Sequence, residues 1–143
     1  MEDELFRPTI QDRSHTAKPP WRPDSILYPA FFGGPVAAAV LGLINGGRLG
    51  LPRVQLAAIA GAAVAAFAAR LVVTASLGGG SGARLAGSLT GILVWLVVMA
   101  FQRRPFRAFS FGGGEPSRLV GPGFAAALGC GVLEAIIIYA VVL

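Results

Sequence analysis

Charged side chains are scarce in this chain of 143 residues, since Asp, Glu, Lys and Arg together make up only 13% of it. Soluble globular proteins carry about 25%. Hydrophobic residues account for 55% of the chain, and the mean hydropathy is +0.69. So few charges cannot cover a surface that faces water. The composition therefore excludes an ordinary soluble domain and predicts a small integral membrane protein whose solvent is the lipid bilayer.

Cysteine and histidine are almost absent as well. The single cysteine, Cys130, excludes an intramolecular disulfide and a multi-cysteine metal site, and its glycine neighbours predict a small residue packed inside a helix. The single histidine, His15, lies in a polar segment. HExxH, GxSxG and P-loop motifs are all missing, and the glycine run at 78–82 lacks the lysine of a phosphate-binding loop. We therefore expect no catalytic residue, no cofactor and no metal site.

The positive charge is concentrated next to the apolar segments. Residues 1–25 hold four basic and five acidic side chains, whereas the rest of the chain holds eight arginines and only Glu115 and Glu134. Arginines between apolar runs anchor helix ends at anionic headgroups. Because no basic face or nucleic-acid motif accompanies them, nucleic-acid binding is not expected.

The first 25 residues differ in character from the remainder. They show no secretory signal pattern, and four prolines lie among charges with little apolar periodicity. The sequence predicts a polar, disordered tail over 1–25 and a transmembrane domain over 26–143. Five residues are expected to anchor the domain at the membrane surface: Trp21, Tyr28, Arg103, Arg104 and Arg107.

Four apolar runs follow, and each is close to the roughly 20 residues that cross a bilayer. They cover residues 26–45, 53–75, 84–101 and 122–143. Because unpaired backbone groups are too costly in lipid, the runs predict four transmembrane helices in an all-α bundle. Gln102-Arg103-Arg104-Pro105 is expected to end the third helix. The following segment, with Phe106, Phe109 and Phe111, is expected to form a loop that lies on the headgroups or binds a partner.

The first run contains Gly33-Gly34-Pro35, where Pro35 lacks the amide that would bond the Phe31 carbonyl. A kink or break is therefore predicted there. Two interpretations stay open at this stage. The kink serves helix packing, or it makes a discontinuous helix that lines a substrate site, as in transporters.

Small residues recur at every fourth position and predict close helix contacts. Spacing alone does not decide whether these rows pack within one chain or between chains. The four rows are Gly34, Ala38, Gly42 and Gly46; Ala57, Gly61, Ala65 and Ala69; Ala83, Gly87 and Gly91; and Gly121, Ala125 and Gly129.

Glu134 is the one carboxylate inside an apolar run, and an ionisable group at that depth needs a partner. Arg70 and Thr90 lie at similar depths in their own runs, so the three residues are predicted to form a buried polar cluster. As a structural element the cluster fixes the register of two helices. As a functional element, Glu134 carries a proton during transport. A third possibility is that Glu134 pairs with another subunit.

The sequence thus favours a non-catalytic accessory or scaffold subunit of a plasma membrane of the bacterial inner-membrane type. Its expected partners are the lipid bilayer and either further copies of itself or a larger membrane complex. The alternative is a small proton-coupled transporter or channel that uses Glu134 as an oligomer. Four crossings would put both termini on one side, and we expect that side to be the cytoplasm.

Overall fold

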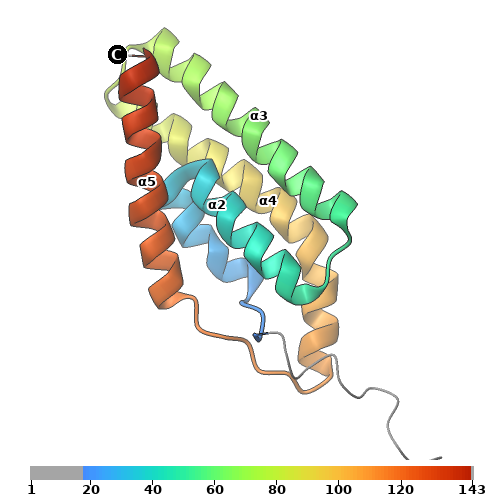
Figure 1. Ribbon diagram of the computed structural model, residues 1–143. Helices are drawn as coiled ribbons and strands as arrows, with labels where there is room; N and C mark the ends of the chain where they lie inside the picture. The colour runs from blue at the N-terminus through green and yellow to red at the C-terminus, as the bar shows by residue number, and fades with distance from the viewer. Residues whose placement is uncertain (1–17, 143) are drawn as a thin grey trace, which may run out of the picture.

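A computed structural model describes residues 18–142, so most of the predicted disordered tail, residues 1–17, lies outside the described residues, as does Leu143. The described chain forms one 3-10 turn, η1 (Pro23–Ile26), and four α-helices: α2 (Leu27–Leu49), α3 (Arg53–Leu77), α4 (Ser81–Phe111) and α5 (Val120–Val142) (Figure 1). Over residues 18–142 the only β pairing is an isolated bridge between Trp21 and Ser117. By residue number and composition alone, all four helices are long and apolar enough to span a membrane.

Helix α2 is folded back on itself. Gly34 adopts φ 78° and ψ −166°, which lies outside the helical region. A straight helix would place residue 45 about 27 Å from residue 27 at 1.5 Å per residue. Nevertheless, the Trp21 amide donates to Asn45 Oδ1 at 2.7 Å, and Asn45 Nδ2 donates to the Trp21 carbonyl at 3.0 Å. Residues 23–33 and 35–49 are therefore two antiparallel limbs, which we call the α2 hairpin, with Gly33-Gly34-Pro35 as its tip (Figure 1).

The tip sequence accounts for this reversal. The φ/ψ pair at Gly34 belongs to a region that is essentially restricted to glycine. Pro35 then opens the second limb, a position where its missing N–H costs nothing and its fixed φ suits a helix. The segment expected over 26–45 therefore does not follow the path of one kinked helix, because its two limbs run antiparallel.

The hairpin also changes the placement of the chain ends. Helices α3, α4 and α5 run the length of the bundle in alternating directions, whereas the hairpin begins and ends at one side (Figure 1). Lys18 therefore lies at the end of the bundle with Trp21 and the α4–α5 loop, which we call the Trp21 end. Val142 lies with Gly78–Gly80 at the opposite end, which we call the Val142 end. The two ends of the described chain therefore lie at opposite ends of the bundle.

Helix α4 does not stop at residue 101, and the predicted basic and aromatic loop is helical up to Phe111. Pro105 lies inside this helix, where a proline removes one helix hydrogen bond and crowds the preceding turn. Meanwhile, the fully buried Gln102 holds this turn against the hairpin, because its Nε2 donates to the Gly42 carbonyl at 2.6 Å. The expected anchors Arg103, Arg104 and Arg107 are exposed on this last part of α4.

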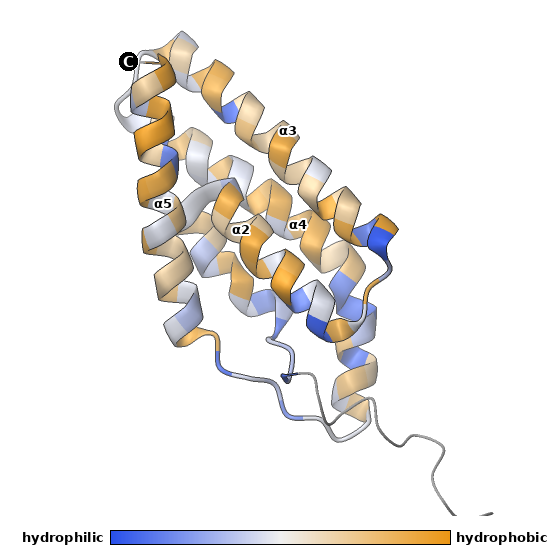
Figure 2. Ribbon diagram, in the orientation of Figure 1, coloured by the Kyte–Doolittle hydropathy of each residue, from blue (hydrophilic) through white to orange (hydrophobic). Residues whose placement is uncertain are grey.

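The small-residue rows separate into two kinds. Those of the hairpin and of α4 pack within the chain: a Cβ added at Gly42 would lie 2.5 Å from Val98 Cγ2, so the two helices approach closely. The rows of α3 and α5 are exposed, and an added Cβ at Gly61, Gly121 or Gly129 would have no neighbour within 4 Å. The outward faces of α3 and α5 are apolar along most of their length (Figure 2).

Trp21 does not act as the expected surface anchor. Its side chain is buried in the core at the Trp21 end, beneath the Arg48 guanidinium, which lies 4.0 Å from the ring centre. The Ser117 amide also donates to the Pro20 carbonyl at 3.0 Å. These contacts pack residues 18–25 against the bundle, so the predicted disordered tail does not extend to residue 25. Tyr28 is partly buried, and its hydroxyl donates to the Leu119 carbonyl at 3.0 Å.

Candidate functional site

The hairpin tip is fixed in the interior by a carboxylate from α5. Glu134 is fully buried, and its Oε1 accepts the amide N–H of Val36 at 2.8 Å. Val36 follows Pro35 at the start of the second limb, where backbone amides lack partners within their own helix. A carboxylate at that position satisfies a free donor and suits the positive end of the helix dipole. Glu134 therefore caps the returning limb of the hairpin.

Arg70 supplies the counter-charge. Its guanidinium forms an ion pair with Glu134 Oε2, and its side chain is 15% exposed, whereas that of Glu134 is not exposed at all. The pair joins α3 to α5 directly at the tip of the hairpin. The structure thus brings Arg70 and Glu134 together around the Gly33-Gly34-Pro35 segment.

Thr90 does not join this cluster. Its hydroxyl donates to the carbonyls of Ala86 at 2.7 Å and Gly87 at 3.1 Å, which belong to its own helix. This backbone-directed bond is a common alternative for a threonine inside a helix. The predicted hydrogen bond from Thr90 to the Glu134 carboxylate is therefore wrong.

Two glycines make room for the ion pair. A Cβ added at Gly34 would lie 2.6 Å from Glu134 Oε2 and 2.7 Å from Arg70 Nη1. A Cβ at Gly87 would lie 2.7 Å from Arg70 Cζ. The sequence singled out Gly34 for its backbone freedom, but the steric requirement at Gly87 depends on where the guanidinium lies. Its only signal in the sequence was its place in the small-residue row of α4.

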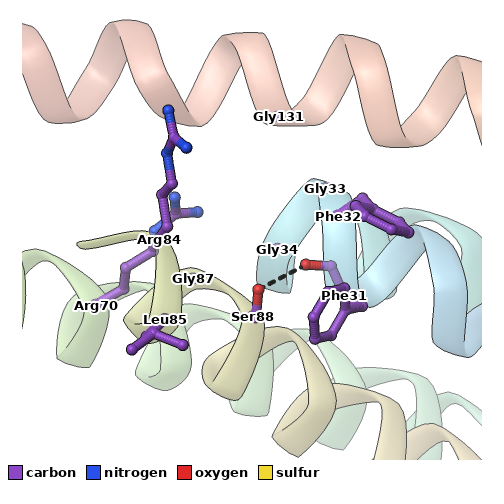
Figure 3. A pocket seen from close by; sticks show the side chains of 10 residues that line it. All are labelled: Phe31, Phe32, Gly33, Gly34, Arg70, Arg84, Leu85, Gly87, Ser88 and Gly131. Atoms are coloured by element: carbon purple, nitrogen blue, oxygen red, sulfur yellow. Dashed lines mark hydrogen bonds between the residues drawn. The ribbon is translucent and has the colours of Figure 1, made fainter. Parts of the chain in front are cut away.

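A cavity of about 510 Å³ lies beside the tip, and Arg70 is one of the residues that line it. Figure 3 shows Arg70 and Arg84 on one side of it, Phe31 and Phe32 on the other, and α5 passing over it. The remaining lining comes from Gly33, Gly34, Leu85, Gly87, Ser88 and Gly131. Glu134 does not line the cavity. The places of Arg84 and Ser88 in this lining could not be predicted, because nothing in their local sequence distinguishes them.

The site lies nearer to the Val142 end. Arg70 is seven residues before the end of α3, and Glu134 is eight before the end of α5. At 1.5 Å per residue both lie about 10–12 Å from that end. Ser88 donates to the Phe31 carbonyl at 3.0 Å and ties α4 to the last turn of the first limb.

The chemistry of the site is limited to charge and hydrogen bonding. Within residues 18–142, no three His, Cys, Asp or Glu side chains lie close enough together to hold a metal ion. No protein-family model, curated protein sequence or solved structure matches this chain. The site geometry offers one paired carboxylate, one paired arginine and a cavity that a second arginine also lines.

Proposed function

We propose that this protein is a non-catalytic, multi-pass integral membrane protein that acts as an accessory or scaffold subunit. Its hairpin enters the membrane from the Trp21 end and returns to it, while α3, α4 and α5 cross. Non-helical backbone at membrane depth is tolerated only where protein buries it or it lines a cavity. The burial of Gly33, Gly34 and Pro35 is consistent with that requirement.

The observation that carries this proposal is the use of Glu134. Its carboxylate binds the Val36 amide and Arg70, it is not exposed, and it does not line the cavity. A carboxylate that carries protons must exchange them with water. Glu134 is instead enclosed behind Arg70, which favours a structural latch on the hairpin over a proton carrier.

The outward faces of α3 and α5 support a role in assembly. In lipid, helices associate through small residues that let their backbones approach closely. The exposed rows that contain Gly61 on α3 and Gly129 on α5 have this character and are not used within the chain. Lipid covers these faces in the isolated protein, and helices of a second copy or of a larger membrane complex cover them in the assembly.

The positive charges support one orientation, with the Trp21 end in the cytoplasm of a plasma membrane of the bacterial inner-membrane type. Among residues 18–142, Arg84 is the one basic residue near the Val142 end apart from the paired Arg70. The Trp21 end carries Lys18, Arg22, Arg48, Arg53, Arg103, Arg104, Arg107 and Arg118. Cytoplasmic loops carry the excess of Lys and Arg, so Val142 would lie on the outer side.

A second candidate function is a small proton-coupled transporter. The specific observation in its favour is that a broken helix and Arg70 line a cavity next to a buried carboxylate, as in transporters with discontinuous helices. In this case Glu134 releases Arg70 when it takes up a proton, and the tip moves.

Substitutions in the ion pair separate the two functions. As a latch, Glu134→Gln keeps an acceptor for the Val36 amide and leaves Arg70 beside the cavity, so we expect a loss of about 1.5–3 kcal/mol. Arg70→Ala strands a fully buried carboxylate and should cost more, about 3–5 kcal/mol. Unfolding by SDS titration in mixed micelles measures both losses. Transport would be favoured instead if the wild-type protein carries protons into liposomes and Glu134→Gln abolishes this flux without a loss of stability.

Assembly is tested by affinity isolation from native membranes, with Gly61→Leu as the disrupting variant. An added side chain at Gly61 meets open space within the chain, so the fold should tolerate it while a helix packed on the α3 row is displaced. The matched control is Ala75→Leu, another small-to-large change at an exposed position of α3 outside the row. If neither the wild-type protein nor Gly61→Leu is isolated with a second copy or another protein, the scaffold role is contradicted.

A further inference from the structure

The cavity at the hairpin tip carries positive charge without enough negative charge to balance it. Both charged residues that line it are arginines, Arg70 and Arg84. Among the described residues the only ion pair is that of Arg70 with Glu134, so Arg84 has no acidic partner. A charge at the edge of an apolar bundle is costly unless a counter-ion is close.

Arg70 lines the cavity and has donor capacity that no group of the described chain uses. A guanidinium offers five N–H donors in a fixed planar fork that matches an oxyanion. One terminal nitrogen, Nη1, is directed to Glu134, while the buried Nε has no hydrogen-bond partner within the chain. Figure 3 shows the side chains of Arg70 and Arg84 on the same side of the cavity, opposite Phe31 and Phe32. Two arginines therefore line the same side of one cavity, where an anion would complete the charge balance.

The opposite wall and the rim are apolar. Phe32 is 74% exposed and Leu85 is 64% exposed, and both line the cavity. Arg84 is the fourth residue of α4, so it lies about 5 Å inside that end of the bundle, at the level expected for headgroups. An occupant that fits all these surfaces has an anionic head and an apolar body.

We propose that this cavity is a binding site for a phosphate-bearing anion, with the phosphate between Arg84 and Arg70. Its occupant is the headgroup of an anionic phospholipid, whose acyl chain lies over Phe32 and Leu85. Basic pockets between transmembrane helices bind lipid headgroups in this way. The site does not depend on the role proposed above for Glu134, because that carboxylate faces the hairpin rather than the cavity.

The test uses the full-length protein in detergent and native mass spectrometry with added lipid. Phosphatidylglycerol is compared with zwitterionic phosphatidylcholine of the same acyl chains, and inorganic phosphate is tested in parallel by thermal shift. Arg84→Gln removes one charge at an exposed position that the fold does not need, and it should weaken phosphatidylglycerol binding about tenfold, because a hydrogen bond to a charged group is lost. The matched control, Arg53→Gln, removes an exposed arginine at the start of α3, at the other end of the bundle.

A second variant adds charge instead of removing it. Leu85→Glu places a carboxylate at the rim, where it should compete with the anion and also weaken binding about tenfold. The lipid site is supported if the wild-type protein and Arg53→Gln prefer phosphatidylglycerol, whereas Arg84→Gln and Leu85→Glu lose this preference. The same pattern with inorganic phosphate alone supports the phosphate site with a soluble source. Equal losses in Arg84→Gln and Arg53→Gln, or no binding of either anion to the wild-type protein, would overturn the proposal.

Discussion

Gly34→Ala should destabilise this protein more than the glycine-to-alanine substitution of any other glycine in the α2 hairpin. The backbone at Gly34, with φ 78° and ψ −166°, is one that alanine adopts only at a cost of about 1–3 kcal/mol. The added methyl group would also lie 2.6 Å from Glu134 Oε2 and 2.7 Å from Arg70 Nη1. It therefore separates a buried ion pair, a change that costs about 3–5 kcal/mol. We expect a total loss of about 4 kcal/mol or more, a large fraction of the 5–15 kcal/mol typical of folded domains.

The matched control is Gly47→Ala, in the second limb of the same hairpin. An added Cβ at Gly47 has no neighbour within 4 Å, and alanine is the better helix former by about 1 kcal/mol. We therefore expect Gly47→Ala to be neutral or slightly stabilising. SDS titration in mixed micelles, followed by circular dichroism, gives the unfolding free energy of both variants. Equal stability of Gly34→Ala and Gly47→Ala would refute both the glycine-specific turn and its contact with the ion pair.

Two further predictions concern how the hairpin is held. Asn45→Ala should cost about 2–4 kcal/mol in the same titration, because it leaves the buried Trp21 amide and Gln102 Oε1 without partners; a loss below about 0.5 kcal/mol would show that these bonds do not hold the hairpin ends together. Gly91→Ala should cost about 1–3 kcal/mol, because its methyl group would overlap the Ala30 carbonyl and push α4 away from the hairpin, whereas Gly61→Ala, in open space on α3, should cost nothing. Similar melting temperatures for these two alanine variants would contradict the close packing of α4 on the hairpin.

Composition and local chemistry were sufficient to predict the class of fold and part of the candidate site. Scarce charge and long apolar runs predict an all-helical chain with helices long enough to span a membrane, which the described helices confirm. Glu134 and Arg70 could be paired in advance because they are the only opposite charges at similar depths in apolar runs. The predicted bond from Thr90 to Glu134 was wrong, because the position of a residue along its helix does not determine its rotamer. The Thr90 hydroxyl instead donates to a carbonyl of its own helix.

The path of the chain could not be read from the same signals. Gly33-Gly34-Pro35 indicates an interruption, but a kink of a few tens of degrees and a full reversal require the same residues. The reversal depends on distant partners, namely Asn45 against Trp21 and Glu134 against Val36, whose contacts close only in three dimensions. Likewise, Pro105 is a stop signal by itself, but the buried Gln102 beside it holds the helix onto the hairpin. The reversal of α2 also places the C-terminal end of α5 at the end of the bundle opposite to Trp21.

The central claim, that α2 is a hairpin with both ends on one side, is tested most directly by a single distance. Spin labels at Asp24→Cys and Gly47→Cys, both exposed positions, in a Cys130→Ala background report the separation of the two limbs by double electron-electron resonance. A continuous helix would separate these positions by about 35 Å at 1.5 Å per residue. The hairpin, in which Trp21 is hydrogen-bonded to Asn45, predicts a distance below about 20 Å, well short of that rise. A distribution centred near 35 Å would contradict the fold described for α2 and the site built on its tip.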